Sequence, residues 1–318
     1  MFRNIKRLAD WVGSIALALI LTALAPGANA AKPLLVVTTT QDLAAIATEI
    51  AGDRARVEPL AKGYQDPHFV DAKPSLLVKL RKANLFVEVG RDLEVGWVPG
   101  LLQSARNPRV QSGGPGFVDA SAGIAVLEQG AKVGREGGDV HPLGNPHHWL
   151  NPSNGLVIAA NIRDGLIRIA PADRAYFEAR YADFERRLRG RIAGWKKDAE
   201  AMGLTGLKVV TYHRSWPYFA EAFGFQVVNY VEPRPGVPPA PRHIQDLTQQ
   251  MKAERIPLLI VEPYFDPKLP ARVAQNSGAA LVILPPSVGA TPEAKDYFSL
   301  FDAQLAAIRK ALAGRRNP

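Results

Sequence analysis

The sequence predicts an α/β protein made of two lobes, each with a parallel sheet covered by helices, and joined by one long rigid helix. Three observations predict this fold class. Short apolar runs alternate with helix-like segments, which is the pattern of parallel strands connected by covering helices. This alternation stops near the middle of the chain and then restarts. Between the two blocks lies one long segment with the periodicity of a single amphipathic helix.

The first block carries apolar runs that are short enough to be strands. We expect strands at 33–40, 56–61 and 85–90, separated by helices at 41–52 and 74–83. A further helix is expected to begin near Ser153.

The second block repeats the same rhythm after the midpoint of the chain. The expected strands are 207–213, 225–232, 257–264 and 280–286, and the expected helices are 216–223, 241–254, 267–276 and 292–313. The short connections between them favour parallel strands with covering helices.

The segment from Ala172 to about Met202 is the strongest periodic stretch, and it follows Pro171, a favourable residue at a helix start. Its apolar residues recur at steps of three and four and so form one stripe, which consists of Phe177, Tyr181, Phe184, Leu188, Ile192 and Trp195. Such a helix would be roughly 45 Å long. We interpret it as a strut joining both lobes, although an ordinary surface helix with one buried face explains the stripe equally well.

The chain begins with the features of a cleaved secretory signal. Basic residues precede an apolar run, and a small-residue cleavage site follows, so residues 1–30 are interpreted as a signal peptide. The remaining length of about 290 residues exceeds what one core usually serves. We therefore expect an N-terminal lobe at 31–171, a linking helix at 172–202 and a C-terminal lobe at 203–318.

Composition limits the classes of function. The chain has no cysteine, which excludes disulfides, thiolate metal sites and a lipid-bearing cysteine after the signal. Its net charge of +9 falls to +7 without the leader, which holds three Lys or Arg and one Asp. Because the charges interleave along helix-like segments, we expect solvated surfaces and no nucleic-acid partner. A periplasmic monomer fits best, with a mobile glycine-rich loop from Gln129 to Gly144.

Potential metal ligands follow several of the predicted strands. His68 comes shortly after the second strand, His213 ends the strand 207–213, and Glu262 ends the strand 257–264. His147 and His148 lie in the loop before the helix at Ser153. Ligands of parallel sheets bind beyond the carboxyl ends of the strands, so these side chains are candidates for one site.

The local sequence supports metal binding by some of these histidines. Pro67 and Pro146 restrict the backbone before His68 and His147, and Asp66 is placed to accept a ring N–H. Neutral imidazoles without thiolates favour Zn²⁺, whereas Mn²⁺ prefers more oxygen ligands. A single histidine is more often a hydrogen-bonded loop or core residue, and this is how we interpret the two remaining histidines, 141 and 243.

Three motifs, QDPHFVDAKPS, NPHHWLNPSNG and TYHRSWPYFAEAFGF, resemble the signatures of the cluster A-I metal-binding receptors of ABC importers. They occur in the family's order and spacing across nearly the whole chain after the leader. The resemblance implies that His68, His147 and His213 bind the metal, and that His148 occupies a variable position. It also implies two α/β lobes joined by a long helix, with the metal between them.

The sequence departs from that family at two places. An aspartate ligand is often found after the last strand of the C-terminal lobe, where this chain has Pro285 and Pro286. Glu262 is the candidate replacement, with Glu232 or a water as alternatives, although a carboxylate bonded to loop N–H groups is an equal interpretation of Glu262. The long acidic, histidine-rich loop of many zinc receptors is also missing.

The sequence therefore predicts a periplasmic receptor that captures Zn²⁺, ahead of Mn²⁺, Fe²⁺ or Ni²⁺, and delivers it to an inner-membrane ABC permease. No covalent chemistry is expected. Two alternatives use the same histidines: a periplasmic zinc chaperone, and a zinc hydrolase with three histidines and a water. The hydrolase lacks an H-E-x-x-H motif, although Glu262 is available as a base.

Overall fold

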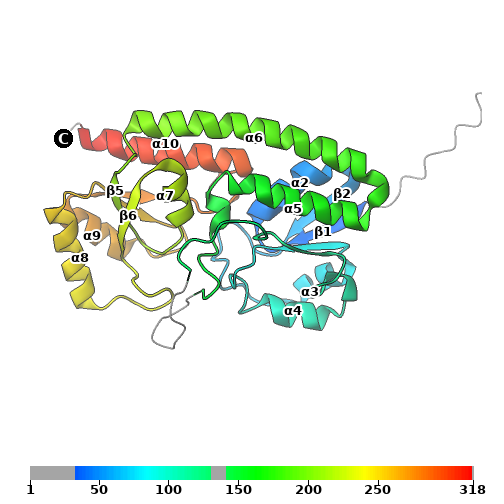
Figure 1. The fold of residues 1–318 in the computed structure, drawn as a ribbon. Coiled ribbons are helices and arrows are strands. Elements are labelled where there is room, and N and C mark those ends of the chain that lie inside the picture. The colour runs from blue at the N-terminus through cyan, green and yellow to red at the C-terminus, as the bar shows by residue number, and fades with distance from the viewer. Residues whose placement is uncertain (1–32, 130–140, 317–318) are drawn as a thin grey trace, which may run out of the picture. The chain divides into compact units, whose positions relative to one another are not determined.

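Residues 33–129 and 141–316 are described by a computed structural model, and their strands form two four-stranded parallel sheets (Figure 1). In each sheet the first strand of its block lies between the second and the third, and the fourth strand lies at the edge beside the third. The two blocks therefore repeat one topology. The predicted fold class is confirmed.

The first sheet forms from short apolar runs that are buried. Its strands are β1 (Leu34–Thr38), β2 (Ala55–Pro59), β3 (Leu85–Glu88) and β4 (Phe117–Asp119). The helices around it are α2 (Gln41–Ala51), α3 (Pro74–Lys82), α4 (Val98–Ala105) and α5 (Asn154–Ile169). Branched apolar residues such as Val36 and Val37 fit the interior of a sheet that is covered on both faces.

The second sheet repeats this construction. Its strands are β5 (Lys208–Thr211), β6 (Gln226–Tyr230), β7 (Leu258–Val261) and β8 (Ala280–Ile283). Its helices are α7 (Pro217–Phe223), α8 (Pro241–Ala253), α9 (Lys268–Ser277) and α10 (Tyr297–Arg316).

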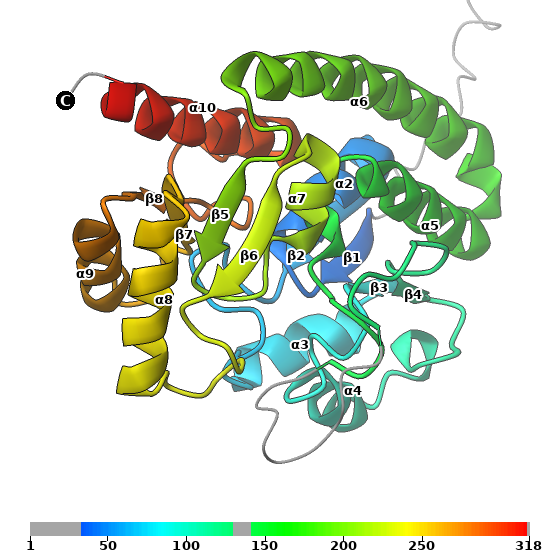
Figure 2. The same ribbon diagram turned by 60° about the vertical axis from the view of Figure 1, so that its left-hand side comes forward.

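The long helix α6 spans Arg174–Met202, 29 residues, after a 3₁₀ turn at Pro171–Asp173. It ends at Gly203, whose φ of 74° is the left-handed conformation that glycine adopts without strain. Helix α6 packs on α2 and α5 of the first block and on α10 of the second, as Figures 1 and 2 show. The predicted strut therefore contacts helices of both blocks.

The apolar stripe of α6 is its main attachment. Phe177, Phe184, Leu188 and Trp195 are buried, and Tyr181 and Ile192 pack beside them in a hydrophobic cluster that also contains strand residues of both sheets. Burying each large apolar side chain contributes about 1.5–3 kcal/mol. This stripe explains why the helix stays docked along its length.

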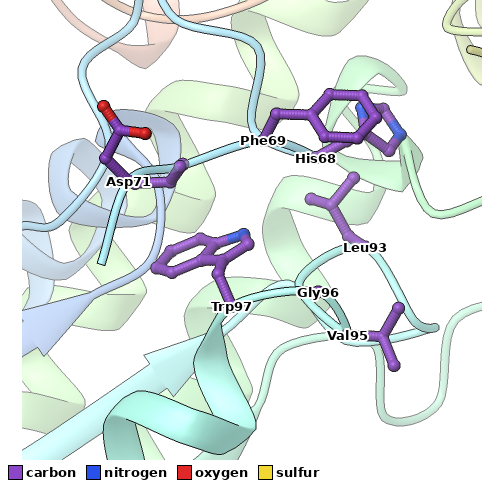
Figure 3. Close-up of a pocket in the computed structure, with 8 residues that line it drawn as sticks. His68, Phe69, Asp71, Leu93, Val95, Gly96 and Trp97 are labelled. Carbon is purple, nitrogen blue, oxygen red and sulfur yellow. The ribbon is translucent and has the colours of Figure 1, made fainter.

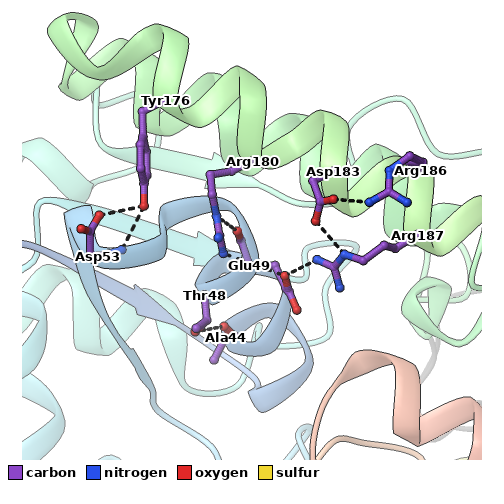
Figure 4. A network of polar contacts seen from close by, with 9 residues as sticks. All are labelled: Ala44, Thr48, Glu49, Asp53, Tyr176, Arg180, Asp183, Arg186 and Arg187. Carbon is purple, nitrogen blue, oxygen red and sulfur yellow. Dashed lines mark hydrogen bonds and ion pairs between the residues drawn. The ribbon is translucent and has the colours of Figure 1, made fainter.

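Polar contacts fix the position of α6 against α2 (Figure 4). The Arg180 guanidinium donates to the Glu49 carbonyl at 2.7 Å, and Arg187 pairs with the Glu49 carboxylate at 2.5 Å. Tyr176 donates its hydroxyl to Asp53 at 2.7 Å. Because these groups are partly exposed, each pair contributes at most about 1 kcal/mol, and they determine the register more than the stability.

The structure differs from the sequence prediction at a few elements. Strand β4, which has only three residues, and helix α4 were not predicted. The last helix begins at Tyr297, later than the predicted 292. The predicted signal peptide and most of the predicted loop Gln129–Gly144 lie outside the described residues. Within the described ranges, no helix is long and apolar enough to span a membrane.

A buried carboxylate lies where the two blocks meet. Asp42, in the first turn of α2, is fully buried and accepts the Val288 backbone N–H at 2.9 Å, beyond the end of β8. Its other oxygen finds no hydrogen-bond partner among the described residues. Burial raises the pKa of Asp42 to about 7, although hydrogen bonds partly offset this effect.

We expect Asp42→Asn to change how stability depends on pH. Between pH 4 and 7 the folded protein holds a proton on Asp42 that the unfolded chain has released, so the unfolding free energy falls as pH rises, by up to about 1.4 kcal/mol per pH unit. The variant lacks this contribution. Urea unfolding at pH 5 and pH 8 should show the variant gaining stability relative to the wild type at the higher pH.

Asp246→Asn is the matched control, because the Asp246 side chain is 68% exposed on α8. It should follow the wild-type pH dependence. A wild-type pH dependence in Asp42→Asn as well would contradict the assigned role of Asp42.

Candidate metal centre

Three histidines from distant parts of the chain meet beyond the carboxyl ends of the two sheets. One potential ligand atom from each of His68, His147 and His213 lies within 4.8 Å of the others. The ring centroids are 5.2 Å apart for His68 and His147, 5.3 Å for His68 and His213, and 5.6 Å for His147 and His213. All three side chains are buried. The sequence prediction that these residues converge is confirmed.

His68 lies in the loop between β2 and α3. The Asp66 carboxylate accepts the His68 backbone N–H at 3.0 Å and lies 2.7 Å from the ring atom Nδ1. Trp97 donates its indole N–H to the carbonyl of Pro67 at 3.0 Å. The loop is therefore held from both sides, and the Asp66 contact makes Nδ1 the protonated ring nitrogen.

His147 lies between a tight turn and a short 3₁₀ helix at His148–Leu150. Gly144 has φ of 94°, and a Cβ there would lie 2.1 Å from Val126 Cγ1, so the turn requires glycine. The Asn145 side-chain oxygen accepts the His147 backbone N–H at 2.9 Å and lies 3.0 Å from its ring Nδ1. Asn145 therefore orients His147 as Asp66 orients His68.

His213 lies two residues beyond the end of strand β5. Its Nδ1 lies 2.7 Å from the Glu232 carboxylate, whose other oxygen accepts the Gly236 backbone N–H at 3.0 Å. The sequence made Glu232 an alternative to Glu262 as the fourth ligand. In the structure both carboxylate oxygens of Glu232 already form hydrogen bonds. This role was not predicted, because Glu232 lies 19 residues from His213 along the chain.

All three rings leave the same nitrogen available to a metal. In each ring an oxygen contacts Nδ1, so Nε2 is the atom that remains for coordination. The Nε2 atoms of His68 and His147 are buried and have no hydrogen-bond partner among the described residues. Buried polar atoms are normally satisfied, so this arrangement fits a site that takes a cation between the rings.

Burial and charge affect the protonation of these rings differently. Burial and the neighbouring imidazoles hold the pKa of His147 well below its usual range, so this ring is neutral. Burial also lowers the pKa of His213, but the hydrogen bond to Glu232 and the charge of Glu262 outweigh it and raise the pKa. The same hydrogen bond that orients His213 therefore also favours its protonated form.

Glu262 lies just after β7 and is fully buried. Burial raises its pKa, while His213, Ser215 and Trp216 act in the opposite direction. Both carboxylate oxygens lack a partner at hydrogen-bond distance among the described residues. Glu262 is close enough to interact electrostatically with His213, but it is not part of the three-histidine group.

Pro285 and Pro286 follow β8 and contribute backbone carbonyls in place of a side-chain ligand. Trp149 donates its indole N–H to the Pro286 carbonyl at 2.9 Å, and Gln304 donates to the Pro285 carbonyl at 2.8 Å. Tyr297 donates its hydroxyl to the Trp149 carbonyl at 2.7 Å. This segment thus holds the loop of His147 from the side of the second sheet.

The other histidines of the described residues differ in their surroundings. His148 is fully buried, its Nε2 bonds the Val89 carbonyl at 3.0 Å, and its pKa is lowered to about 4 by burial. His243 bonds the Tyr230 carbonyl at 2.8 Å. The ring of His141 lies 5.2 Å from the ring of His68, although His141 was interpreted from its sequence context as an ordinary loop residue.

A cavity of about 320 Å³ opens beside His68 (Figure 3). Trp97 and Leu93 form part of its wall, and Phe69 and Val95 are 66% and 60% exposed at its edge. The cavity is lined by apolar side chains together with the polar His68 and Asp71, and it borders the three-histidine group at His68.

Comparison with known proteins places this geometry in a family. A family model described as zinc-uptake complex component A, periplasmic, matches residues 36–311. The chain belongs to this family. The match includes all three histidines and strands of both sheets, and it covers the described fold except for the start of β1 and the end of α10.

Named relatives agree with the assignment. The manganese ABC transporter substrate-binding lipoprotein PsaA of Streptococcus pneumoniae is 27% identical over 292 residues, which cover 89% of this chain and 90% of that protein. The iron-binding protein YfeA of Yersinia pestis is 29% identical over 255 residues, covering 79% and 76%. A crystal structure of ZnuA matches with a TM-score of 0.72 and 24% identity over 88% of this chain and 99% of that one, which supports the fold.

Proposed function

We propose that this protein is a periplasmic receptor that captures Zn²⁺ with His68, His147 and His213 and delivers it to an inner-membrane ABC permease. The observation that carries the proposal is the convergence of three buried imidazoles whose Nδ1 atoms are all occupied by oxygens. Family membership supports it, since the family is described by zinc uptake and the relative PsaA is named as the substrate-binding lipoprotein of a manganese ABC transporter.

Three imidazole nitrogens favour zinc among the metals named for the family and its relatives, which are zinc, manganese and iron. Nitrogen ligands suit Zn²⁺ better than Mn²⁺, which prefers carboxylates and water. Zinc bound to three imidazoles at about 2.0–2.1 Å requires nitrogen atoms about 3.4 Å apart in tetrahedral geometry. The potential ligand atoms lie within 4.8 Å of one another, so an approach of at most about 1.4 Å would bring them to this spacing.

The fourth ligand in this proposal is Glu262 or a water. Glu262 is supported by its burial, its unsatisfied oxygens and its electrostatic interaction with His213. A negative charge there would also offset part of the charge of the ion. Pro285 and Pro286 offer no side-chain ligand, so the aspartate often found at this place in related receptors has no counterpart in this chain.

The proposed transport role assigns a function to the leader, to helix α6 and to the histidine loops. In the proposed scheme the leader directs export and is removed, and the mature monomer carries its ion to the permease. Helix α6 limits how far the lobes 31–171 and 203–318 separate, because its apolar stripe is docked along its length. Release then requires the permease to displace one of the histidine loops.

The cavity beside His68 favours one alternative, a zinc hydrolase, because it offers room for a substrate next to the histidines. Turnover assays with ester, peptide and phosphate substrates test it. Metal-dependent turnover would defeat the receptor proposal. A zinc chaperone is tested by capture of a periplasmic protein that accepts the ion in place of a permease.

Metal analysis of protein purified without chelator, followed by competition titration with Zn²⁺ and Mn²⁺, tests the proposed function directly. We expect one bound ion per chain and a preference for zinc. Absence of stoichiometric binding would refute the receptor function, and a preference for manganese would refute the assigned cargo.

A further inference from the structure

We propose that the Asn145 amide is a clamp between the two halves of the metal centre. It ties the loop that carries His147 to the main chain beside His213 and thereby holds the two rings at one spacing. This inference rests on the proposed function, because it concerns the same three histidines.

Both ends of the Asn145 side chain are occupied. Its oxygen accepts the backbone N–H and contacts the ring Nδ1 of His147, at 2.9 and 3.0 Å. Its amide nitrogen donates to the Arg214 carbonyl at 2.8 Å and to the Glu128 carboxylate at 2.8 Å. Asn145 is only 5% exposed, so water competes little for these bonds. One small side chain thus connects both histidine loops.

Glu128 fixes which way the amide points. An ionised carboxylate accepts hydrogen bonds and cannot donate them. The group of Asn145 that contacts Glu128 must therefore be the NH₂ group. Its other oxygen pairs with the Arg214 guanidinium at 3.2 Å and accepts the Tyr230 hydroxyl at 3.3 Å. The Arg214 guanidinium also lies 4.2 Å from the centre of the Tyr230 ring. The clamp is therefore anchored on residues of the second block.

The geometry requires an amide at position 145. A carboxylate there keeps an acceptor for the His147 ring N–H, but it brings an oxygen without hydrogen against the Arg214 carbonyl and the Glu128 carboxylate. The contact to Arg214 in the second block and the contact to Glu128 would both become repulsive, whereas the contact to His147 would become stronger. The substitution Asn145→Asp therefore distinguishes a clamp between the two loops from a residue that only orients the His147 ring.

Asn145→Asp tests this distinction by the rate of zinc release into excess chelator at pH 8 and by competition affinity. If Asn145 only orients His147, the variant binds zinc as tightly as wild type or more tightly. If Asn145 is a clamp, zinc leaves about tenfold faster and affinity falls in proportion, as expected for losing hydrogen bonds worth about a factor of ten.

Two further variants make the test specific. Asn161→Asp is the matched control, because Asn161 also donates its amide to two carbonyls, of Ala120 and Ala122 at 3.1 and 2.9 Å, away from the three histidines. It should release zinc at the wild-type rate. Adding Glu128→Gln to Asn145→Asp supplies an N–H toward the new carboxylate and should recover part of the lost affinity.

Wild-type release and affinity in Asn145→Asp overturn the clamp. Should that variant fail to fold, Glu128→Ala takes its place, since Glu128 is partly exposed, and we expect zinc release several-fold faster than in the wild type. An unchanged rate there overturns the clamp equally. Failure of the wild type itself to bind zinc in this assay would refute the proposed function instead.

Discussion

Replacing His147 with alanine should lower zinc affinity by more than about a hundredfold, since loss of an outer hydrogen-bond partner of a metal ligand already costs about 10- to 100-fold. The His147 Nε2 is buried without a partner, and the ring lies between those of His68 and Trp149. Removing it leaves two imidazoles, too few for a tight site. Competition titration against a chelator of known affinity measures the change.

His148→Ala is the matched control, because the two histidines are neighbours and both are buried. His148 bonds the Val89 carbonyl after β3, so its loss should lower the unfolding free energy by about 2–4 kcal/mol. Its effect on zinc affinity should stay below about tenfold. A reversed ranking of the two variants would show that His148 is the metal ligand.

The second large effect is a loss of zinc affinity in acid. The pKa of His213 is raised, so protons occupy this ring at a higher pH than they occupy an ordinary histidine, and zinc must displace them. Affinity should be constant at high pH and fall by about tenfold per pH unit for each displaced proton below that pKa. His147 adds little in this range, because its lowered pKa keeps it neutral. Titrations from pH 8 to 5 measure the profile.

Glu232→Gln identifies the source of this pH dependence. The carboxylate raises the pKa of His213 through a hydrogen bond and its charge, so the variant should begin to lose affinity at a lower pH than the wild type. At pH 8 it should bind more weakly, because the ligand becomes less basic. A flat wild-type profile from pH 8 to 5, or an identical onset in both proteins, would contradict this account.

The fold was predictable because each element has a local cause. Apolar runs such as Leu34–Thr38 identify strands, and steps of three and four along α6 identify a helix whose buried residues are those of the predicted stripe. Strand β4 was missed because three residues carry no periodicity. The predicted boundaries of signal peptide, lobes and linking helix remain predictions.

The convergence of the three histidines was predictable, but most of their hydrogen-bond partners were not. His68, His147 and His213 are near strand ends or short motifs, and Asp66 lies two residues before His68. Asn145 precedes His147 by the same two residues, with a proline between them, as Asp66 precedes His68. This pattern could therefore have predicted Asn145 as a hydrogen-bond partner of His147. Glu232 depends on how β5 and β6 align, and contacts between parallel strands leave no trace in local sequence.

The single hydrophobic cluster that runs from Val36 in β1 through Phe184 in α6 to Val209 in β5 and Phe301 in α10 bears on the folding of the chain. Neither half can exclude water from its side of this cluster without the other, so cleavage of the backbone after α6 would produce fragments that stay associated. Assembly of the three-histidine group is therefore tied to complete folding, and a partly folded chain would not bring these side chains together.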